Sequence, residues 1–268
     1  PGGKGSNQAI AAAKLNGEVN FITKIGKDKN GEMALTIYNE LGMNTASIIQ
    51  DEKHSTGVAG IMVNEKTGDN AINIVPGAAG TLISDDIDRN LNFIEKAQIF
   101  LTQLETPYDV TRYALKKAKE KGLVTILNPA PACEIEDDDF QLIDFFTPNE
   151  TEAEFYLNKK IETEKDIKSA SEQFLKKGIK NVVMTLGEKG CYFANEKENF
   201  FINAFKLKEP VLDTTGAGDA FNGALAVGLS KDLDLEEALK FANKVAAIST
   251  TKQGAAASMP SLEDLNNY

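Results

Sequence analysis

The order of patterns along this sequence predicts an α/β fold: a doubly wound, mostly parallel sheet with helices on both faces, plus a small β flap. Short apolar runs alternate with amphipathic stretches of helical period along most of the chain. One β-rich segment interrupts the alternation and has the pattern of a hairpin. No internal repeat or low-complexity linker divides the sequence, so we expect a single α/β domain over residues 1–268.

The strand and helix patterns follow one another in order. Residues 6–15 are Ala-rich and predict a helix that stops at an Asn-Gly pair, and residues 19–25 predict a strand. Residues 31–41 predict a second helix, and residues 99–104 a second strand. Residues 123–127 are continuously apolar, as expected for a strand covered on both faces. The later elements are strands over residues 143–146 and 182–186, an amphipathic helix marked by Ile167, Ala170 and Phe174, and a long helix that begins at Asp234 and runs through Ile248.

A hairpin is predicted over residues 56–75. Residues 56–63 and 70–75 are β-rich runs, and the polar residues 65–69 between them predict the turn. A hairpin inserted in an α/β chain is often a protruding flap. We therefore expect this one to form a lid over a site or to pair with another subunit.

Composition and charge exclude several classes of protein. The chain has 29 basic and 40 acidic residues and a net charge of −11, which argues against binding to nucleic acid. Its two cysteines and single histidine cannot supply a disulfide framework or a multi-His metal site, and they argue against a Ser-His-Asp hydrolase. No membrane-spanning run or signal peptide is present in the sequence. We therefore expect a cytoplasmic protein with no membrane partner.

The segment Asp213-Thr-Thr-Gly-Ala-Gly-Asp-Ala-Phe-Asn-Gly223 is the most informative part of the sequence. Glycines at 216 and 218 free the backbone where an Ala-rich helix begins, and a helix start with exposed N–H groups binds anions. A carboxylate at Asp219 is costly there unless its charge is used. We therefore interpret Asp219 as a base that takes a proton from a hydroxyl during phosphoryl transfer. The alternative is a glycine loop before a core helix, with Asp219 as a helix cap.

Several loops at predicted strand ends and helix starts carry polar residues, where ligands bind in α/β sheets. The stretch Pro1-Gly-Gly-Lys-Gly-Ser-Asn-Gln-Ala9 leads into a helix, and Lys4 and Asn7 offer donors suited to a polyhydroxylated ligand. Glu105 follows a strand, where a hydroxyl-binding carboxylate would stand, although it could equally serve the dipole of the next helix. Residues 128–132 predict a rigid wall without chemistry.

Two further loops suggest a metal and a nucleotide. Asn149 and Glu152 share one face of a helix start and are oxygen ligands suited to Mg²⁺, although a helix cap explains them as well. The glycines of residues 185–190 would let a nucleotide lie against the backbone, and the alternative there is a hairpin turn.

Together these motifs resemble the ribokinase branch of the PfkB family of carbohydrate kinases, over essentially the whole chain. The signatures are Gly2-Gly-Lys-Gly-Ser-Asn-Gln-Ala9 and the segment from Asp213 to Gly223, with Asn149-x-x-Glu152, the loop 185–190 and Gly254-Ala255 in the expected order. Leu104-Glu105, Asn128-Pro-Ala-Pro-Ala132 and residues 147–154 look particularly like ribokinases. The resemblance implies a ribokinase-like fold and ATP-dependent phosphorylation of D-ribose to D-ribose 5-phosphate.

The resemblance also assigns roles to residues. It implies that Asp219 is the catalytic base and that the backbone of Gly216, Ala217 and Gly218 holds the charge on the transferred group. The implied sugar ligands are Gly3, Lys4, Gly5, Ser6, Asn7, Glu105 and Asp219. The implied ATP site consists of Asn149, Thr185, Leu186, Gly187, Glu188, Lys189, Gly190, Gly218, Asp219 and Asn243. Glu152 would organise Mg²⁺, and a monovalent cation, K⁺, would be held by Asp213, Thr215, Ser249, Lys252, Gly254 and Ser258.

The family has a strand and a flap segment upstream of the glycine pair, with an aspartate that also binds the sugar. Because this sequence starts at the glycine pair, we expect an N-terminally incomplete chain, and a homodimer through the hairpin when the full-length chain is present. Two alternatives stay open. One is a kinase of the same family for another substrate, such as deoxyribose, fructose or a nucleoside. The other is a sugar- or nucleotide-binding protein without turnover.

Overall fold

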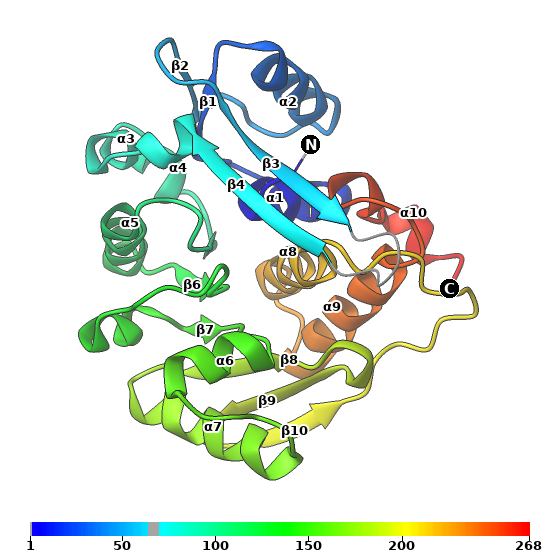
Figure 1. The fold of residues 1–268 in the computed structure, drawn as a ribbon. Coiled ribbons are helices and arrows are strands. Elements are labelled where there is room, and N and C mark those ends of the chain that lie inside the picture. Colours follow the sequence, from blue (N-terminus) through cyan, green and yellow to red (C-terminus); the bar gives the residue numbers. More distant parts are fainter. Residues whose placement is uncertain (1, 64–69) are drawn as a thin grey trace.

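A six-stranded sheet forms the centre of the computed structural model, which describes residues 2–63 and 70–268 (Figure 1). Its strand order is β10-β9-β8-β7-β6-β5. The strands are β5 (Ile99–Thr102), β6 (Val124–Leu127), β7 (Phe145–Phe146), β8 (Asn181–Thr185), β9 (Cys191–Asn195) and β10 (Asn199–Ile202).

The sheet is parallel from β5 to β8 and antiparallel beyond it. Ile99 is paired with Val124 in the parallel part, whereas Thr185 is paired with Cys191 across the antiparallel pair β8 and β9. The predicted α/β sheet is therefore confirmed. The antiparallel extension by β9 and β10 was anticipated only as the alternative for residues 185–190, a hairpin turn.

Helices cover both faces of this sheet, as predicted. Side chains alternate across each strand, so Ile126 belongs to one core cluster and its neighbour Leu127 to another. The helices whose residues build the first cluster with Ile126 include α1 (Lys4–Lys14), α8 (Ala217–Ser230) and α9 (Leu235–Ser249). On the opposite side lie α5 (Tyr108–Glu120), α6 (Glu150–Leu157) and α7 (Glu164–Lys176).

Helices α1 and α8 cross at very short range. A Cβ atom placed on Gly223 would lie 2.6 Å from the carbonyl oxygen of Gln8 and 2.7 Å from Cβ of Ala11. Because real Cβ atoms do not approach other atoms this closely, only glycine fits at this position. The crossing brings the start of α1 against the first turns of α8.

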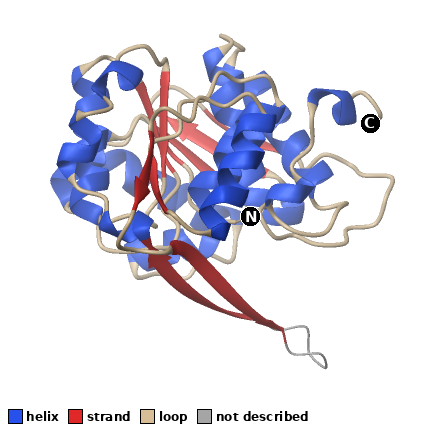
Figure 2. Ribbon diagram, turned by 90° about the horizontal axis from the view of Figure 1, so that it is seen from above, coloured by secondary structure: helices blue, strands red, loops and turns tan. Residues whose placement is uncertain are grey.

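The hairpin lies outside the main sheet. Strands β1 (Thr23–Gly26) and β2 (Ile48–Asp51) form a parallel pair, and β3 (Thr56–Val63) and β4 (Asn70–Gly77) form the antiparallel hairpin. Figure 2 shows that the hairpin projects away from the helices and the other strands. The predicted hairpin is confirmed for these two strands, whereas its predicted turn, residues 65–69, lies outside the described residues. The remaining helices are α2 (Lys29–Glu40), α3 (Ser84–Asp88), α4 (Leu91–Ile94) and α10 (Leu262–Leu265).

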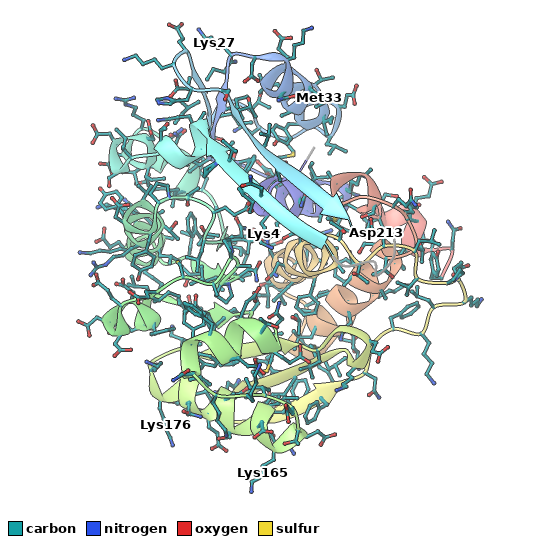
Figure 3. All side chains as sticks on the ribbon, in the orientation of Figure 1. Lys4, Lys27, Met33, Lys165, Lys176 and Asp213 are labelled. Carbon is teal, nitrogen blue, oxygen red and sulfur yellow. The ribbon has the colours of Figure 1, made fainter. Side chains whose placement is uncertain are left out.

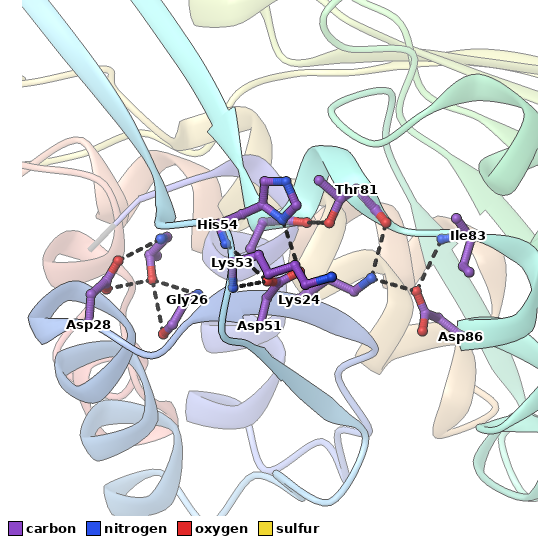
Figure 4. A network of polar contacts seen from close by, with 11 residues as sticks. Lys24, Gly26, Asp28, Asp51, Lys53, His54, Thr81, Ile83 and Asp86 are labelled. Carbon is purple, nitrogen blue, oxygen red and sulfur yellow. Dashed lines mark hydrogen bonds and ion pairs between the residues drawn. The ribbon is translucent and has the colours of Figure 1, made fainter.

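Polar contacts fix the start of the hairpin to the end of β1 (Figure 4). The Asp28 carboxylate caps α2 at the N–H of Gly31 and also accepts hydrogen bonds from the Thr56 N–H, at 2.7 Å, and hydroxyl, at 2.8 Å. The Gly26 N–H in turn donates to the Thr56 hydroxyl oxygen, at 2.9 Å. One carboxylate therefore joins the start of a helix to the root of the hairpin.

A buried ion pair fixes the chain on the other side of the hairpin. Lys24 Nζ lies 2.8 Å from the Asp86 carboxylate and donates to the carbonyl oxygen of Thr81. The two charged side chains are only 11% and 4% exposed. Because Lys24 and Gly26 both belong to β1, this strand holds the hairpin segment at both of its ends (Figure 4).

Within residues 2–63 and 70–268, no helix combines the length and the apolar character needed to cross a membrane.

We predict that Lys24→Met lowers the free energy of unfolding by about 3 kcal/mol, because the buried Asp86 carboxylate would keep only its longer ion-pair contact, 3.8 Å, with the exposed Arg89 guanidinium. Chemical denaturation measures this loss. The matched control is Lys27→Met, whose ion pair with Glu52 is exposed on both sides, so it should leave stability nearly unchanged. Equal effects of the two substitutions would show that the buried pair does not hold this part of the fold.

Candidate functional site

The start of α8 presents unpaired backbone donors. Gly216 caps the helix with a φ of +79°, a left-handed conformation that favours glycine. The N–H of Ala217 turns back to the carbonyl oxygen of Thr214, at 3.1 Å. Among the described residues, the N–H groups of Gly218 and Asp219 have no acceptor. One of the three predicted anion donors, that of Ala217, is therefore engaged within the chain, whereas those of Gly216 and Gly218 are open among the described residues and Asp219 adds a further open donor.

Asp219 is buried in the first turn of α8, with 6% of its surface exposed. Its Oδ2 accepts a hydrogen bond from Asn7 Nδ2 at 2.8 Å, and its Oδ1 accepts one from Gln8 Nε2 at 3.0 Å. Burial raises the pKa of the Asp219 carboxyl above its ordinary value, whereas these two donors and the charge of Lys4 oppose the rise. A carboxylate of raised pKa that stays hydrogen-bonded is suited to accept a proton.

Glu105 and the start of α1 form the next part of the site. The backbone N–H of Lys4 donates to Glu105 Oε2 at 2.6 Å, and Gly3, with a φ of +89°, caps the helix beside it. Burial raises the pKa of the Glu105 carboxyl, and the charge of Asp219 adds to this rise. Figure 3 shows where Lys4 lies at the start of α1. The structure thus brings Gly3, Lys4, Glu105 and Asp219 together.

The side-chain oxygen of Asn7 is an acceptor without a partner among the described residues, whereas the Ser6 hydroxyl is directed to Tyr38. Because Asn7 Nδ2 donates to Asp219, Asn7 Oδ1 remains, and this buried atom has no hydrogen-bond partner among the described residues. A buried acceptor without a partner is expensive unless a ligand supplies a donor, so it points to a hydroxyl-bearing ligand. The Ser6 hydroxyl is instead 2.8 Å from the Tyr38 hydroxyl on α2, which does not support a direct ligand role for it.

Asn149 and Glu152 cap α6 and lie next to the end of β8. The Asn149 side chain accepts from the Glu152 N–H, and the Glu152 carboxylate accepts from the Asn149 N–H at 2.9 Å. The backbone of Asn149 also forms an isolated parallel β-bridge with that of Thr185. Burial raises the pKa of the Glu152 carboxyl, on which the charges of Lys4 and Asp219 also act. The helix cap expected as an alternative is therefore present, and it holds Glu152 near the charged groups of the site.

The loop 185–190 joins β8 to β9 as a hairpin turn, the other alternative considered for this segment. Leu186 is 4% exposed and belongs to the core, so only its backbone is available to a ligand. Gly190 has a φ of +97° and precedes Cys191, whose sulfur accepts a hydrogen bond from Asn243 Nδ2. Asn243 is thus placed beside the end of the loop. The exposed residues of the loop are Gly187, Glu188 and Lys189.

Asp213 ties two loops together beside the start of α8. Its carboxylate accepts from the N–H of Thr215 and from the N–H of Gly254, each at 2.9 Å. Hydrogen bonds from Thr215 and Gly254 lower the pKa of this carboxyl. A Cβ atom on Gly216 would lie 3.2 Å from Ala255, so the second loop packs against the helix start. Figure 3 labels Asp213 in the chain that leads to α8.

The other predicted cation ligands lie around the same loop, with their side-chain groups engaged within the chain. The Ser249 hydroxyl donates to Ala246, the Ser258 hydroxyl to Ala255, and Lys252 pairs with Asp264. The positions Asp213, Thr215 and Gly254 are in contact, whereas the side chain of Lys252 is directed to α10.

Two surface hollows of 640 and 480 Å³ lie away from these residues. The larger is lined by Tyr108, Phe140 and Tyr156 among others, and the smaller by Phe205 and Phe241 among others. Neither is lined by a predicted site residue. The candidate site is instead a polar region built from helix starts and strand ends.

Sequence reasoning missed three amide side chains next to Asp219. Gln8 contacts Asp219 directly, and Gln103 and Asn128 both bond to Gln8. Asn128 is thus hydrogen-bonded to Gln8, and the wall without chemistry expected for residues 128–132 stays a prediction. Gln8 and Asn128 both lie within motifs named above and Gln103 does not, but the contacts among the three could be found only from the fold.

The site gathers three carboxyl groups whose pKa values are raised by burial: those of Glu105, Glu152 and Asp219. Lys4 is the cation whose charge acts on all three. Shifted carboxyl groups concentrated beside an anion-binding helix start are typical of a catalytic centre. Such a centre can activate a hydroxyl and hold a phosphoryl group.

Comparisons with known proteins agree with this geometry. Residues 1–262 match the model of the pfkB family carbohydrate kinases. A ribokinase from Staphylococcus aureus (strain COL) is 40% identical over 266 residues, which cover 99% of this chain and 86% of that protein. A deoxyribokinase from Salmonella typhi is 38% identical over 268 residues, covering 100% of this chain and 87% of that protein. The structure of an Arabidopsis thaliana ribokinase complexed with ribose and ATP matches with a TM-score of 0.90 and 30% identity, over 99% of this chain and 86% of that one.

Proposed function

Because the chain belongs to the pfkB family of carbohydrate kinases and is an ATP-dependent sugar kinase, we propose that it phosphorylates the 5-hydroxyl of D-ribose. The observation that carries this proposal is the Asp219 carboxylate, buried beside open backbone donors at the start of α8. The ribokinase relative and the ribose and ATP complex of the Arabidopsis thaliana protein support the choice of substrates.

In the proposed reaction, Asp219 accepts the proton of the 5-hydroxyl as that oxygen bonds to the γ-phosphorus of ATP. The bond between the γ-phosphorus and the bridging oxygen breaks, and its electron pair stays on the oxygen of ADP. The open N–H groups of Gly218 and Asp219 stabilise charge on the transferred group. Positioning and charge stabilisation account for most of the catalysis of such a transfer.

The sugar is bound by the groups at the start of α1. Asn7 Oδ1 accepts a hydrogen bond from a sugar hydroxyl, which satisfies the buried atom that has no partner among the described residues. Glu105 accepts a hydrogen bond from a second sugar hydroxyl, because only one of its carboxylate oxygens accepts from the Lys4 N–H. Gly3 lets the ring approach the backbone beside Glu105, whereas the space next to Gly5 is filled by the side chains of Gln103 and Phe21.

The nucleotide is held along the loop 185–190, with Asn149 and Asn243 at its ends. The described residues contain no group of three acidic, His or Cys side chains arranged to hold a metal. This fits Mg²⁺, which takes one or two carboxylates and completes its coordination with phosphates and water, and Glu152 is the carboxylate for it here. When bound, Mg²⁺ neutralises charge on the phosphate oxygens.

The hairpin formed by β3 and β4 acts as a lid over the sugar and as a dimer contact. Its projection from the body supports this role (Figure 2). Val58 and Val75 are paired across the hairpin and are 49% and 53% exposed. An isolated two-stranded ribbon with exposed apolar side chains is marginal in water, and a second copy of the chain would cover them.

A second candidate substrate is 2-deoxy-D-ribose. The sequence identity of this chain to the Salmonella typhi deoxyribokinase, 38%, is nearly as high as its identity to the Staphylococcus aureus ribokinase, 40%. The two sugars differ by one hydroxyl. Whether that hydroxyl has a partner in the site decides between them, because a site built to bind it rejects the analogue that lacks it.

We predict that Asp219→Asn lowers turnover of D-ribose and ATP by about 10²-fold or more, because the amide cannot accept the proton. Binding of an ATP analogue, measured by calorimetry, should survive. Asp166→Asn is the matched control, since Asp166 holds the same position in the first turn of α7, where it caps the helix and lies 3.5 Å from Lys159 Nζ.

If both variants turned over at nearly the wild-type rate, Asp219 would be only a helix cap. A wild-type protein that bound sugar and nucleotide without releasing ADP would favour the binding protein over the kinase.

We also predict that activity is clearly higher in potassium than in sodium or choline buffers. In this proposal the loop held by Asp213 encloses K⁺, mostly through the backbone carbonyls of Thr215, Ser249, Lys252 and Gly254 and through Ser258, and this fixes the start of α8. Asp213→Ala should flatten the difference between the buffers. Equal rates in all three buffers for the wild-type protein would remove the cation from the account.

A further inference from the structure

Behind Asp219 lies a closed ring of buried hydrogen bonds. Gln8 Nε2 donates both to Asp219 Oδ1, at 3.0 Å, and to Asn128 Oδ1, at 3.1 Å. Asn128 Nδ2 donates to the carbonyl oxygen of Thr147, at 3.1 Å. The Thr147 hydroxyl donates to Asn222 Oδ1 at 2.6 Å, and Asn222 Nδ2 donates to the carbonyl oxygen of Gly218 at 2.9 Å. The ring thus leaves α8 at Asp219 and returns to it at Gly218.

The ring is buried, and its hydrogen bonds all lead away from Gln8, which donates to both of its neighbours in the ring. The side chains of Gln8, Thr147 and Asn222 are each 1% exposed. Gln103 donates to Gln8 Oε1, which leaves only the NH₂ group of Gln8 to face Asp219. A reversed Gln8 amide would set its oxygen against Asp219 Oδ1 and Asn128 Oδ1, and these two buried acceptors would then lose their donor.

Three neighbouring strands supply the partners of Gln8 and Asn128. Gln103 follows β5, Asn128 follows β6 and Thr147 follows β7. The carboxyl edge of the parallel sheet therefore holds the orientation of one glutamine on α1, and that glutamine holds the carboxylate on α8.

We propose that Gln8 is a positioning residue for phosphoryl transfer, which holds the Asp219 carboxylate in the direction of the sugar hydroxyl, and that Gln103 fixes the orientation of the Gln8 amide. This rests on the proposed role of Asp219 as the base. Asn7 binds the other carboxylate oxygen and also faces the ligand, whereas Gln8 has all its polar atoms engaged within the chain. Gln8 therefore acts on the reaction through Asp219.

The charged groups that act on Asp219 come from three elements: Lys4 on α1, Glu105 after β5 and Glu152 on α6. None of them is changed by a substitution at Gln8. Loss of the Gln8 donor removes an interaction that favours the charged carboxylate, so the pKa of Asp219 should rise. Because the base must be ionised to act, the acidic limb of the profile of kcat/KM against pH should then move to higher pH.

The test uses Gln8→Met, which keeps the length of the side chain and removes its hydrogen bonds. We expect kcat with D-ribose and ATP to fall about 10- to 100-fold and the acidic limb to move to higher pH. The KM values for both substrates should change little. Gln103→Leu should give a smaller change of the same kind, because Gln8 keeps its donor but loses the bond that orients it. Gln173→Met, on α7, is the control and should change nothing.

A folded Gln8→Met protein with wild-type kcat and an unmoved acidic limb would overturn the inference. So would a loss confined to the KM for the sugar. If Gln8→Met fails to fold, Gln103→Leu decides: a wild-type pH profile would overturn the proposal, and a shifted one would support it. Failure of the proposed function is distinguishable, because it shows as full activity of Asp219→Asn.

Discussion

The burial of one carboxylate, that of Asp219, is the constraint on which the site depends. A buried ionised carboxylate is costly unless donors surround it, and here the donors come from Asn7 and Gln8 on another helix. They reach Asp219 only because α1 and α8 cross where Gly223 has no side chain. The packing of α1 against α8, the buried charge of Asp219 and the positions of Asn7 and Gln8 therefore depend on one another.

The three carboxyl groups of the site differ in their hydrogen-bond partners. Glu105 is engaged by the N–H of Lys4, and Glu152 by the N–H of Asn149. Each of these bonds opposes the rise in pKa that burial causes. Asp219 lies in the first turn of α8, beside the open N–H groups of that helix start. In the proposed function, these three carboxyl groups hold the sugar, organise Mg²⁺ and accept the proton, respectively, according to their neighbours.

Much of the fold and of the site could be predicted from the sequence, because local patterns carry it. The helix start at Gly216 and the helix cap at Asn149 can be predicted from the residues next to them in the sequence. The sequence could not show that Ser6 faces Tyr38 or that Leu186 enters the core, because these depend on which side of an element meets its neighbour. The partners of Gln8 lie about a hundred residues away, so only the assembled sheet brings them together.

Phosphorus NMR of the products formed from ATP and D-ribose tests most directly whether this polar region transfers a phosphoryl group to a primary sugar hydroxyl. Reactions with 2-deoxy-D-ribose and D-fructose run in parallel. We expect a phosphate ester on the fifth carbon of D-ribose, formed in step with ADP and faster than the other products. ADP released without a sugar phosphate, or phosphate on the anomeric carbon, would contradict it.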